Sequence, residues 1–179
     1  MPLNRLSPAA FLALATVHLP ALHRVGVYLT GNRSDAEDLI QDTLEKALAR
    51  RAELRDPLAL KGWLIAVQRT VFLNQQRGLR RKLEIIDGGR AAAATPPAGN
   101  LEKEIEEKEF DEGLRRALET LPEEWCDALW LREVEELSYD EIASVQSCPV
   151  GTVRSRLARA RDAMLRQLSK ERDRVSVFR

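Results

Sequence analysis

The feature that most constrains the fold is a short capped segment, a tight turn and an arginine-rich segment near the C-terminal end of the chain. Ser138-Tyr139-Asp140-Glu141 has the form of a capping box, and Leu137 and Ile142 are spaced for a hydrophobic staple across it. Pro149 then starts a longer final helix that is predicted to reach about Leu168. A short helix, a turn and a longer helix form the arrangement that presents a helix to the DNA major groove.

The final helix divides into an apolar and a polar face. A narrow arc, predicted to pack on the preceding helices, holds Val150, Val153, Leu157, Ala160 and Met164. The side chains that point away from this apolar arc are Ser155 and Arg159, with Thr152, Ala158 and Asp162 beside them. The flanks of the helix carry Arg154, Arg156 and Arg161. Early-helix Arg and Ser side chains can reach base edges, whereas flanking arginines are expected to bind phosphate. The alternative is an amphipathic surface helix whose arginines are solvated.

The formal net charge is zero, but the charges are unevenly distributed. From Lys61 to Lys82 all six charged residues are basic, and from 154 to 166 five arginines face a single acid, Asp162. Acidic residues dominate 35–45 and 102–112. Two basic segments predict two contacts with a polyanion, separated by surfaces that repel it or meet a basic partner. Solvated faces of both signs are the alternative.

Several other classes of protein find no support in the sequence. No apolar run is long enough to insert in a membrane, and the apolar stretch 9–17 lacks the basic lead of a signal peptide. Cys126 and Cys148 lack metal-ligand spacing and are predicted to be reduced and packed, which fits a cytoplasmic location. His18 and His23 do not share a helical face. We expect no metal, no cofactor and no enzyme activity, because no nucleophile–base set or phosphate loop is present.

A Gly-, Ala- and Pro-rich stretch, 88–100, interrupts the chain and is typical of a flexible linker. Neither half contains a convincing β-alternating run. The predicted fold class is therefore all-α, with two small helical domains at 1–84 and 105–179 and a linker at 85–104.

Cap and turn residues predict the other helices. Gly31-Asn32 is a C-cap pair, Ser34-Asp35-Ala36-Glu37 has the form of a second capping box, and Asp56-Pro57 combines an N-cap with a proline at the first position. The predicted helices are Pro8 to Thr30, Ser34 to about Ala52, Leu60 to Arg77, Glu102 to Leu121 and Trp125 to Glu136.

These segments resemble a known family. Leu121 to Glu124, Leu131 to Ala143 and Pro149 to Arg156 resemble the fourth conserved region of bacterial RNA polymerase sigma factors of the extracytoplasmic-function (ECF) group. Leu29 to Thr43 resembles regions 2.1 to 2.2 of that group. Lys61-Gly62-Trp63-Leu64, with the residues Arg69, Asn74 and Arg77 that follow, resembles regions 2.3 to 2.4. Trp63 also looks like a stacking platform, although its place in the apolar stripe favours a core role.

The resemblance implies an alternative sigma factor, which binds core RNA polymerase and directs promoter recognition, −10 melting and transcription initiation. Its implied partners are promoter DNA, the β′ clamp helices and β flap of the polymerase, and an anti-sigma factor. The clamp helices would meet the second helix of the family, here through Asp35, Asp38, Gln41, Asp42 and Glu45.

Two sets of DNA-contacting residues follow from the same resemblance. The −10 set, with the loop 50–60 holding an extruded base, is Leu54, Arg55, Lys61, Arg69, Thr70, Asn74, Arg77, Arg80 and Arg81. The −35 set is Arg132, Thr152, Arg154, Ser155, Arg156, Ala158 and Arg159.

Four positions depart from the common family pattern. Thr70 replaces an Asn, Asn74 an Asp and Leu54 a Phe, which leaves the −10 sequence open. Ala158 stands where several relatives carry a larger residue, so an apolar contact with a base is weaker or absent there. The alternative function is a stand-alone helix-turn-helix regulator, which would bind its operator without polymerase, usually as a dimer. No dimerising heptad run or sensor domain supports it.

Overall fold

The computed structural model describes residues 7–54, 56–86 and 117–176, with side chains up to residue 81 in the second range and residue 169 in the third. Within these ranges every regular element is helical, which confirms the predicted all-α fold class.

The chain divides into two compact units, Met1–Lys103 and Glu104–Arg179. The predicted linker, 85–104, lies almost wholly outside the described residues, as does most of the helix predicted from Glu102 to Leu121. The predicted domain limits therefore stay predictions.

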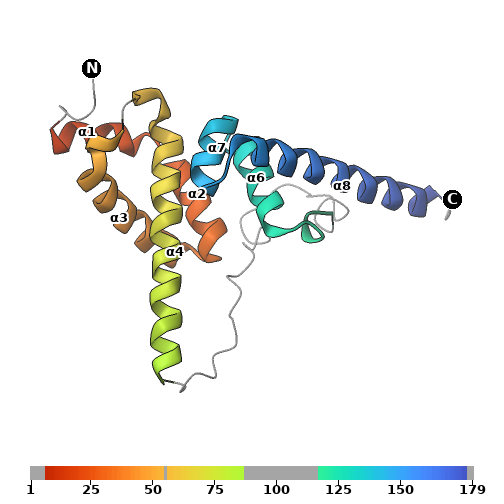
Figure 1. Cartoon of the computed structure of the whole chain (residues 1–179), viewed down its shortest axis with the longest axis horizontal. Helices are drawn as coiled ribbons and strands as arrows, with labels where there is room; N and C mark the ends of the chain where they lie inside the picture. The colour runs from red at the N-terminus through yellow and green to blue at the C-terminus, as the bar shows by residue number, and fades with distance from the viewer. Residues whose placement is uncertain (1–6, 55, 87–116, 177–179) are drawn as a thin grey trace. The chain divides into compact units, whose positions relative to one another are not determined.

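In the first unit, α2 (Leu19–Thr30), α3 (Arg33–Arg50) and α4 (Leu60–Ile86) pack on one another, and α1 (Pro8–Thr16) contacts α3 and α4 (Figure 1). Two short 3-10 helices, η2 (Arg51–Glu53) and η3 (Pro57–Ala59), connect α3 to α4. All four α-helices contribute fully buried side chains to this core, among them Phe11, Leu22, Leu39, Leu64 and Ile65.

The N-terminal segment is two helices, so the prediction of one helix from Pro8 to Thr30 is wrong. The axes of α1 and α2 differ by 69° across a break at residues 17–18. Pro20 lies in the first turn of α2, has no amide proton, and in a continuous helix its ring would clash with the carbonyl of Thr16. Among the described residues no single helix is long and apolar enough to cross a membrane, and α1 with α2 reaches that length only across the bend.

The start of α3 also differs from the prediction. Asn32 is the N-cap: its backbone is extended, and its side-chain oxygen accepts a hydrogen bond from the Asp35 amide at 2.8 Å. The capping box predicted at Ser34 and Glu37 is wrong, because Ser34 already lies inside the first turn. Gly31 ends α2 in the left-handed region, φ 77°, as its C-cap position predicts.

Close approach of α2 to its neighbours depends on Gly26 and Gln68. A Cβ atom on Gly26 would lie 3.2 Å from both the Ala36 Cβ and the Gln68 Nε2. The buried Gln68 Nε2 donates to the Leu22 carbonyl at 2.8 Å. This hydrogen bond fixes the register of α4 against α2, and α4 carries the whole basic stretch from Lys61 to Lys82.

The second unit contains α6 (Glu123–Glu133), α7 (Tyr139–Gln146) and α8 (Val150–Ser176), which all pack on one another (Figure 1). The capping box of α7 is confirmed: the Ser138 Oγ accepts from the Glu141 amide at 3.3 Å, and the Glu141 carboxylate accepts from the Ser138 amide at 2.8 Å. Leu137 and Ile142, the predicted staple, are both buried.

Three helix ends lie away from their predicted positions. α6 ends at Glu133 rather than Glu136, whose backbone has a positive φ of 54°. α4 continues to Ile86 and α8 to Ser176, because the residues past the predicted ends are mostly good helix formers.

Replacing Asn32 with Ala should lower the free energy of opening of α3 by about 1 kcal/mol, because the Asp35 amide loses its acceptor. Native-state hydrogen exchange of the α3 amides measures this loss helix by helix, which suits a chain of two units. Ser34→Ala is the matched control, and its α3 amides should stay at least as well protected as in the parent. A loss in Ser34→Ala, with no loss in Asn32→Ala, would instead make Ser34 the cap.

Candidate nucleic-acid interface

The start of α8 is set by the turn that precedes it. Ser147 ends α7 in the left-handed conformation, φ 51° and ψ 45°, and the Cys148 amide donates to the Ala143 carbonyl at 3.0 Å. The Thr152 amide then donates to the Pro149 carbonyl at 2.8 Å, which opens the new helix. The predicted order of short helix, turn and long helix is therefore confirmed.

The two predicted faces of α8 are also present. Val153, Leu157 and Ala160 are buried against α6 and α7. Arg154, Ala158 and Arg159 are exposed. A face that carries two guanidinium groups and one small side chain can lie close to a polyanion without steric obstruction.

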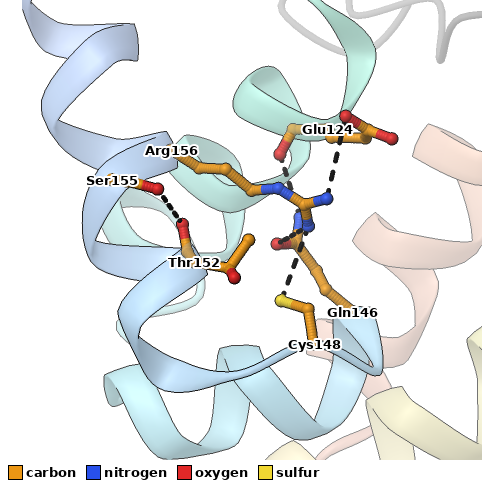
Figure 2. A network of polar contacts seen from close by, with 6 residues as sticks. All are labelled: Glu124, Gln146, Cys148, Thr152, Ser155 and Arg156. Carbon is orange, nitrogen blue, oxygen red and sulfur yellow. Dashed lines mark hydrogen bonds and ion pairs between the residues drawn. The ribbon is translucent and has the colours of Figure 1, made fainter.

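Thr152 and Ser155 lie on the same part of α8 and are both half-buried. The Ser155 hydroxyl donates to the Thr152 carbonyl at 2.8 Å, as Figure 2 shows. Because the hydroxyl proton is used within the helix, the Ser155 oxygen offers its lone pairs, and it is suited to accept a hydrogen bond from a base amino group.

Arg159 lies over an aromatic ring of α6. Its guanidinium carbon is 6.0 Å from the centroid of the half-buried Trp125 ring. A cation–π contact at an exposed site is worth about 0.5–1 kcal/mol. Here it restricts the directions in which the Arg159 side chain can extend.

Arg156 points toward its own unit. Its guanidinium Nη1 donates to the Gln146 Oε1 at 2.9 Å and to the Cys148 Sγ at 3.5 Å, and its Nη2 lies 3.7 Å from the Glu124 carboxylate (Figure 2). The side chain is only 18% exposed. The predicted phosphate contact would require it to leave these partners.

Two further arginines, Arg161 and Arg132, have partners within the second unit. Arg161 pairs with Glu133 at 2.7 Å, and its pKa is raised chiefly by this hydrogen bond and then by one with Tyr139. Arg132, one of the predicted −35 residues, donates to the Leu137 carbonyl at 2.8 Å and lies 5.4 Å from the Tyr139 ring centroid. Among the described arginines of α6 and α8, Arg132, Arg156 and Arg161 are thus hydrogen-bonded within the unit, whereas Arg154 and Arg159 lie exposed on α8.

The basic stretch of the first unit follows α4. Of its predicted DNA-contacting residues, Thr70, Asn74, Arg77 and Arg81 are exposed, whereas Lys61, Arg69 and Arg80 are half-buried. The Thr70 hydroxyl donates to the Ala66 carbonyl at 2.9 Å. Trp63 is half-buried and meets the Phe11 ring edge-on at 6.4 Å, which favours the core interpretation of this residue.

The loop before α4 presents a different residue from the one predicted. Leu54 is 5% exposed, so its side chain is packed into the unit, and Arg55 lies outside the described residues. Leu58 in η3, which no sequence pattern singles out, is 91% exposed. The Asp56 side chain accepts from the Leu58 amide at 2.9 Å, which confirms Asp56 as the N-cap of this turn.

Four acidic residues and one amide of α3 share one exposed side of that helix, as their spacing predicts. The acidic residues are Asp35, Asp38, Asp42 and Glu45, and the amide is Gln41. Asp42 accepts a hydrogen bond from the Gln75 Nε2 on α4 at 2.7 Å, so this acidic side borders the helix with the basic stretch.

Sequence reasoning missed the α6 and α7 residues that contact the α8 arginines, namely Glu124, Trp125, Glu133 and Gln146. No local pattern could have found them, because each contact joins residues that only the packing of α6 and α7 on α8 brings together.

Both units match known sequence families. Residues 14–82 match Sigma-70 region 2, and residues 111–171 match Sigma-70, region 4. Because the first half matches a sigma region, a stand-alone helix-turn-helix regulator is not favoured.

Individual relatives agree with the family matches. The ECF RNA polymerase sigma factor EcfG of Rhodopseudomonas palustris is 34% identical over 146 residues, covering 82% of this chain and 78% of the relative. The ECF RNA polymerase sigma-E factor of Escherichia coli is 36% identical over 137 residues, covering 73% and 72%. The solved structure of the sigma factor RpoE from Bartonella quintana, in complex with the anti-sigma factor NepR, has a TM-score of 0.65 at 30% identity and covers 89% of this chain and 96% of that one. The chain therefore belongs to the sigma-70 family, as an alternative sigma factor of the ECF group and hence a transcription initiation factor.

Proposed function

We propose that this sigma factor joins core RNA polymerase and holds promoter DNA at two points, the −35 duplex through α8 and the −10 strand through α4. The observation that carries the proposal is the outer face of α8 in a chain of this family, where exposed Arg159 lies away from the buried apolar stripe and exposed Arg154 lies at the edge of the face. The domain limits 1–84 and 105–179, joined by 85–104, belong to the same proposal.

At the −35 element, the exposed arginines of α8 have different tasks. Arg159 would donate two hydrogen bonds to a guanine edge, and the Ser155 oxygen would accept one from a neighbouring base. The contact of Arg159 with Trp125 and the internal hydrogen bond of Ser155 support these roles. Arg154 at the edge of the face binds phosphate and fixes the helix on the duplex. The small Ala158 leaves room for the base pairs but offers little apolar contact.

At the −10 element, α4 supplies a cationic surface with no acidic residue between 61 and 81. Such a surface follows the backbone of a single strand, while Arg77 and Asn74 contact phosphate or neighbouring bases. The loop before α4 receives the extruded base, and the exposed Leu58 is an apolar group on which a base can rest.

The polymerase holds both units at the correct separation. The acidic side of α3 pairs with basic residues of the β′ clamp helices, and the second unit binds the β flap. Each DNA contact alone is weak, but linking two contacts raises the effective concentration of the second. The free protein should therefore bind promoters poorly.

An anti-sigma factor is the remaining expected partner, in the cytoplasm. Support comes from the B. quintana sigma factor RpoE, which was solved with the anti-sigma factor NepR. A protein that covers the α3 side and the α8 face would keep this sigma factor from polymerase and from DNA.

Run-off transcription tests the proposal. Purified core polymerase from the same bacterium should transcribe a promoter library with random −35 and −10 elements only when the chain is added. The holoenzyme should bind the selected promoters at least about 100-fold more tightly than the free chain does. Tight duplex binding by the chain alone, with no effect on core polymerase, would contradict a sigma function.

Replacing Arg159 with Ala should remove about 1–3 kcal/mol of discrimination at one or two −35 positions, because the bidentate donor to a base is lost. Trp125→Leu should remove about 0.5–1 kcal/mol at the same positions, since the arginine loses its cation–π support. Sequencing transcripts from the −35 library measures both changes.

The matched control is Arg166→Ala on the same helix, whose exposed guanidinium pairs with Asp162 at 2.6 Å. Its −35 preferences should match those of the parent. If Arg159→Ala lowers transcription equally from all −35 sequences, Arg159 is a phosphate ligand instead of a base reader.

A further inference from the structure

Arg156 joins three separate segments of the second unit. From the second turn of α8 its guanidinium reaches Gln146 at the end of α7, Cys148 in the turn and Glu124 in the first turn of α6 (Figure 2). Gln146 completes the network, since its Nε2 donates to the Glu124 carbonyl at 3.0 Å. Every segment that leads into α8 is thus connected to Arg156.

Both terminal nitrogens of this guanidinium are engaged, and the side chain is 18% exposed. To bind a phosphate it would have to break a charge-assisted contact and leave Gln146 without its donor, which carries a cost comparable to the bond that it gains. Neighbouring Arg154 is exposed and faces no such cost. We propose that Arg156 is a positioning residue, which fixes the start of α8 against α6 and α7 and does not bind DNA.

This role deepens the proposed −35 recognition and depends on it. Ser155 and Arg159 are on the same two turns of α8 as Arg156, so a tilt of these turns moves the base-reading groups together. Only a planar guanidinium can serve three partners in different directions, and a lysine ammonium on a flexible stem is a poor substitute. Arginine identity, rather than positive charge, is therefore the requirement at this position.

The experiment uses holoenzyme with one promoter fragment, selected by the wild-type protein, for affinity, and with the −35 library for base preferences. The association constant is measured between 0.1 and about 0.4 M KCl, a range over which each lost phosphate contact lowers the slope of log K against log[KCl] by about 0.9. The variants are Arg156→Gln, Arg156→Lys and Gln146→Ala, with Arg154→Gln as the matched phosphate-contact control.

A positioning residue gives a distinct pattern. Arg156→Gln and Arg156→Lys should both weaken binding roughly tenfold at every salt concentration, with the wild-type slope. Both should also flatten the −35 base preferences. Gln146→Ala should produce the same kind of loss, and combining it with Arg156→Gln should add little, because the two side chains act in one network. Arg154→Gln should lower the slope by about 0.9 and keep the base preferences.

The opposite pattern overturns the proposal. A phosphate ligand would show a reduced slope in Arg156→Gln, near-normal binding in Arg156→Lys and no effect of Gln146→Ala. If Arg156→Gln is unfolded at the assay temperature, as a thermal melt would show, the Lys and Gln146 variants still separate the two roles. If the wild-type chain does not direct core polymerase to promoters, the proposed function itself is wrong. This result differs from both patterns described above.

Discussion

The packing of the apolar stripe of α8 on α6 and α7 determines what the second unit can present to its surroundings. With Val153, Leu157 and Ala160 buried, helical periodicity leaves Arg159 and Arg154 no inward direction. The same packing brings the flanking Arg156 and Arg161 to opposite ends of α6, where Glu124 and Glu133 accept them. The packing of this apolar stripe thus decides which arginines pair with acidic residues of the same unit and which are available to bind a polyanion.

A comparable division holds in the first unit, where α3 carries acidic residues and α4 basic ones. The two helices pack side by side, so surfaces suited to a basic protein and to nucleic acid lie next to each other. Asp42 and Gln75 join them at 2.7 Å. A basic partner that binds Asp42 must share this carboxylate with α4, so binding on the acidic side reaches the helix expected to hold the −10 strand.

Local chemistry made much of this fold predictable. The predictions that are wrong also have local causes. The Ser138 box was found because its turn offers a single candidate cap, and the stripe of α8 because its period is regular. At α3, Asn32 and Ser34 both have cap chemistry, and the left-handed Gly31 decides the choice by turning the chain so that Asn32 is extended. The break before Pro20 was overlooked because the residues on both sides are apolar enough for one long helix.

The sequence allowed us to predict which helix carries the candidate site. It did not allow us to predict which residues of the neighbouring helices hold the arginines of that helix. Helical spacing placed Ala158 and Arg159 outward and Arg154 and Arg156 on the flanks, where both arginines were expected to bind phosphate. Helical spacing gives the direction of a side chain and not its contacts. Only the packed unit reveals that Glu124, Trp125 and Gln146 meet the α8 arginines.

That bracing matters more in this chain because Ala158 offers a base almost no apolar surface. In the proposed −35 contact, discrimination then falls to a few polar groups, and a hydrogen bond loses most of its value when its angle is poor. Arg159 over Trp125 and the start of α8 held by Arg156 both reduce the freedom of these groups before DNA arrives. A recognition helix with few contacts therefore needs its rigidity from the helices behind it, and α6 and α7 supply that rigidity through Glu124, Trp125 and Gln146.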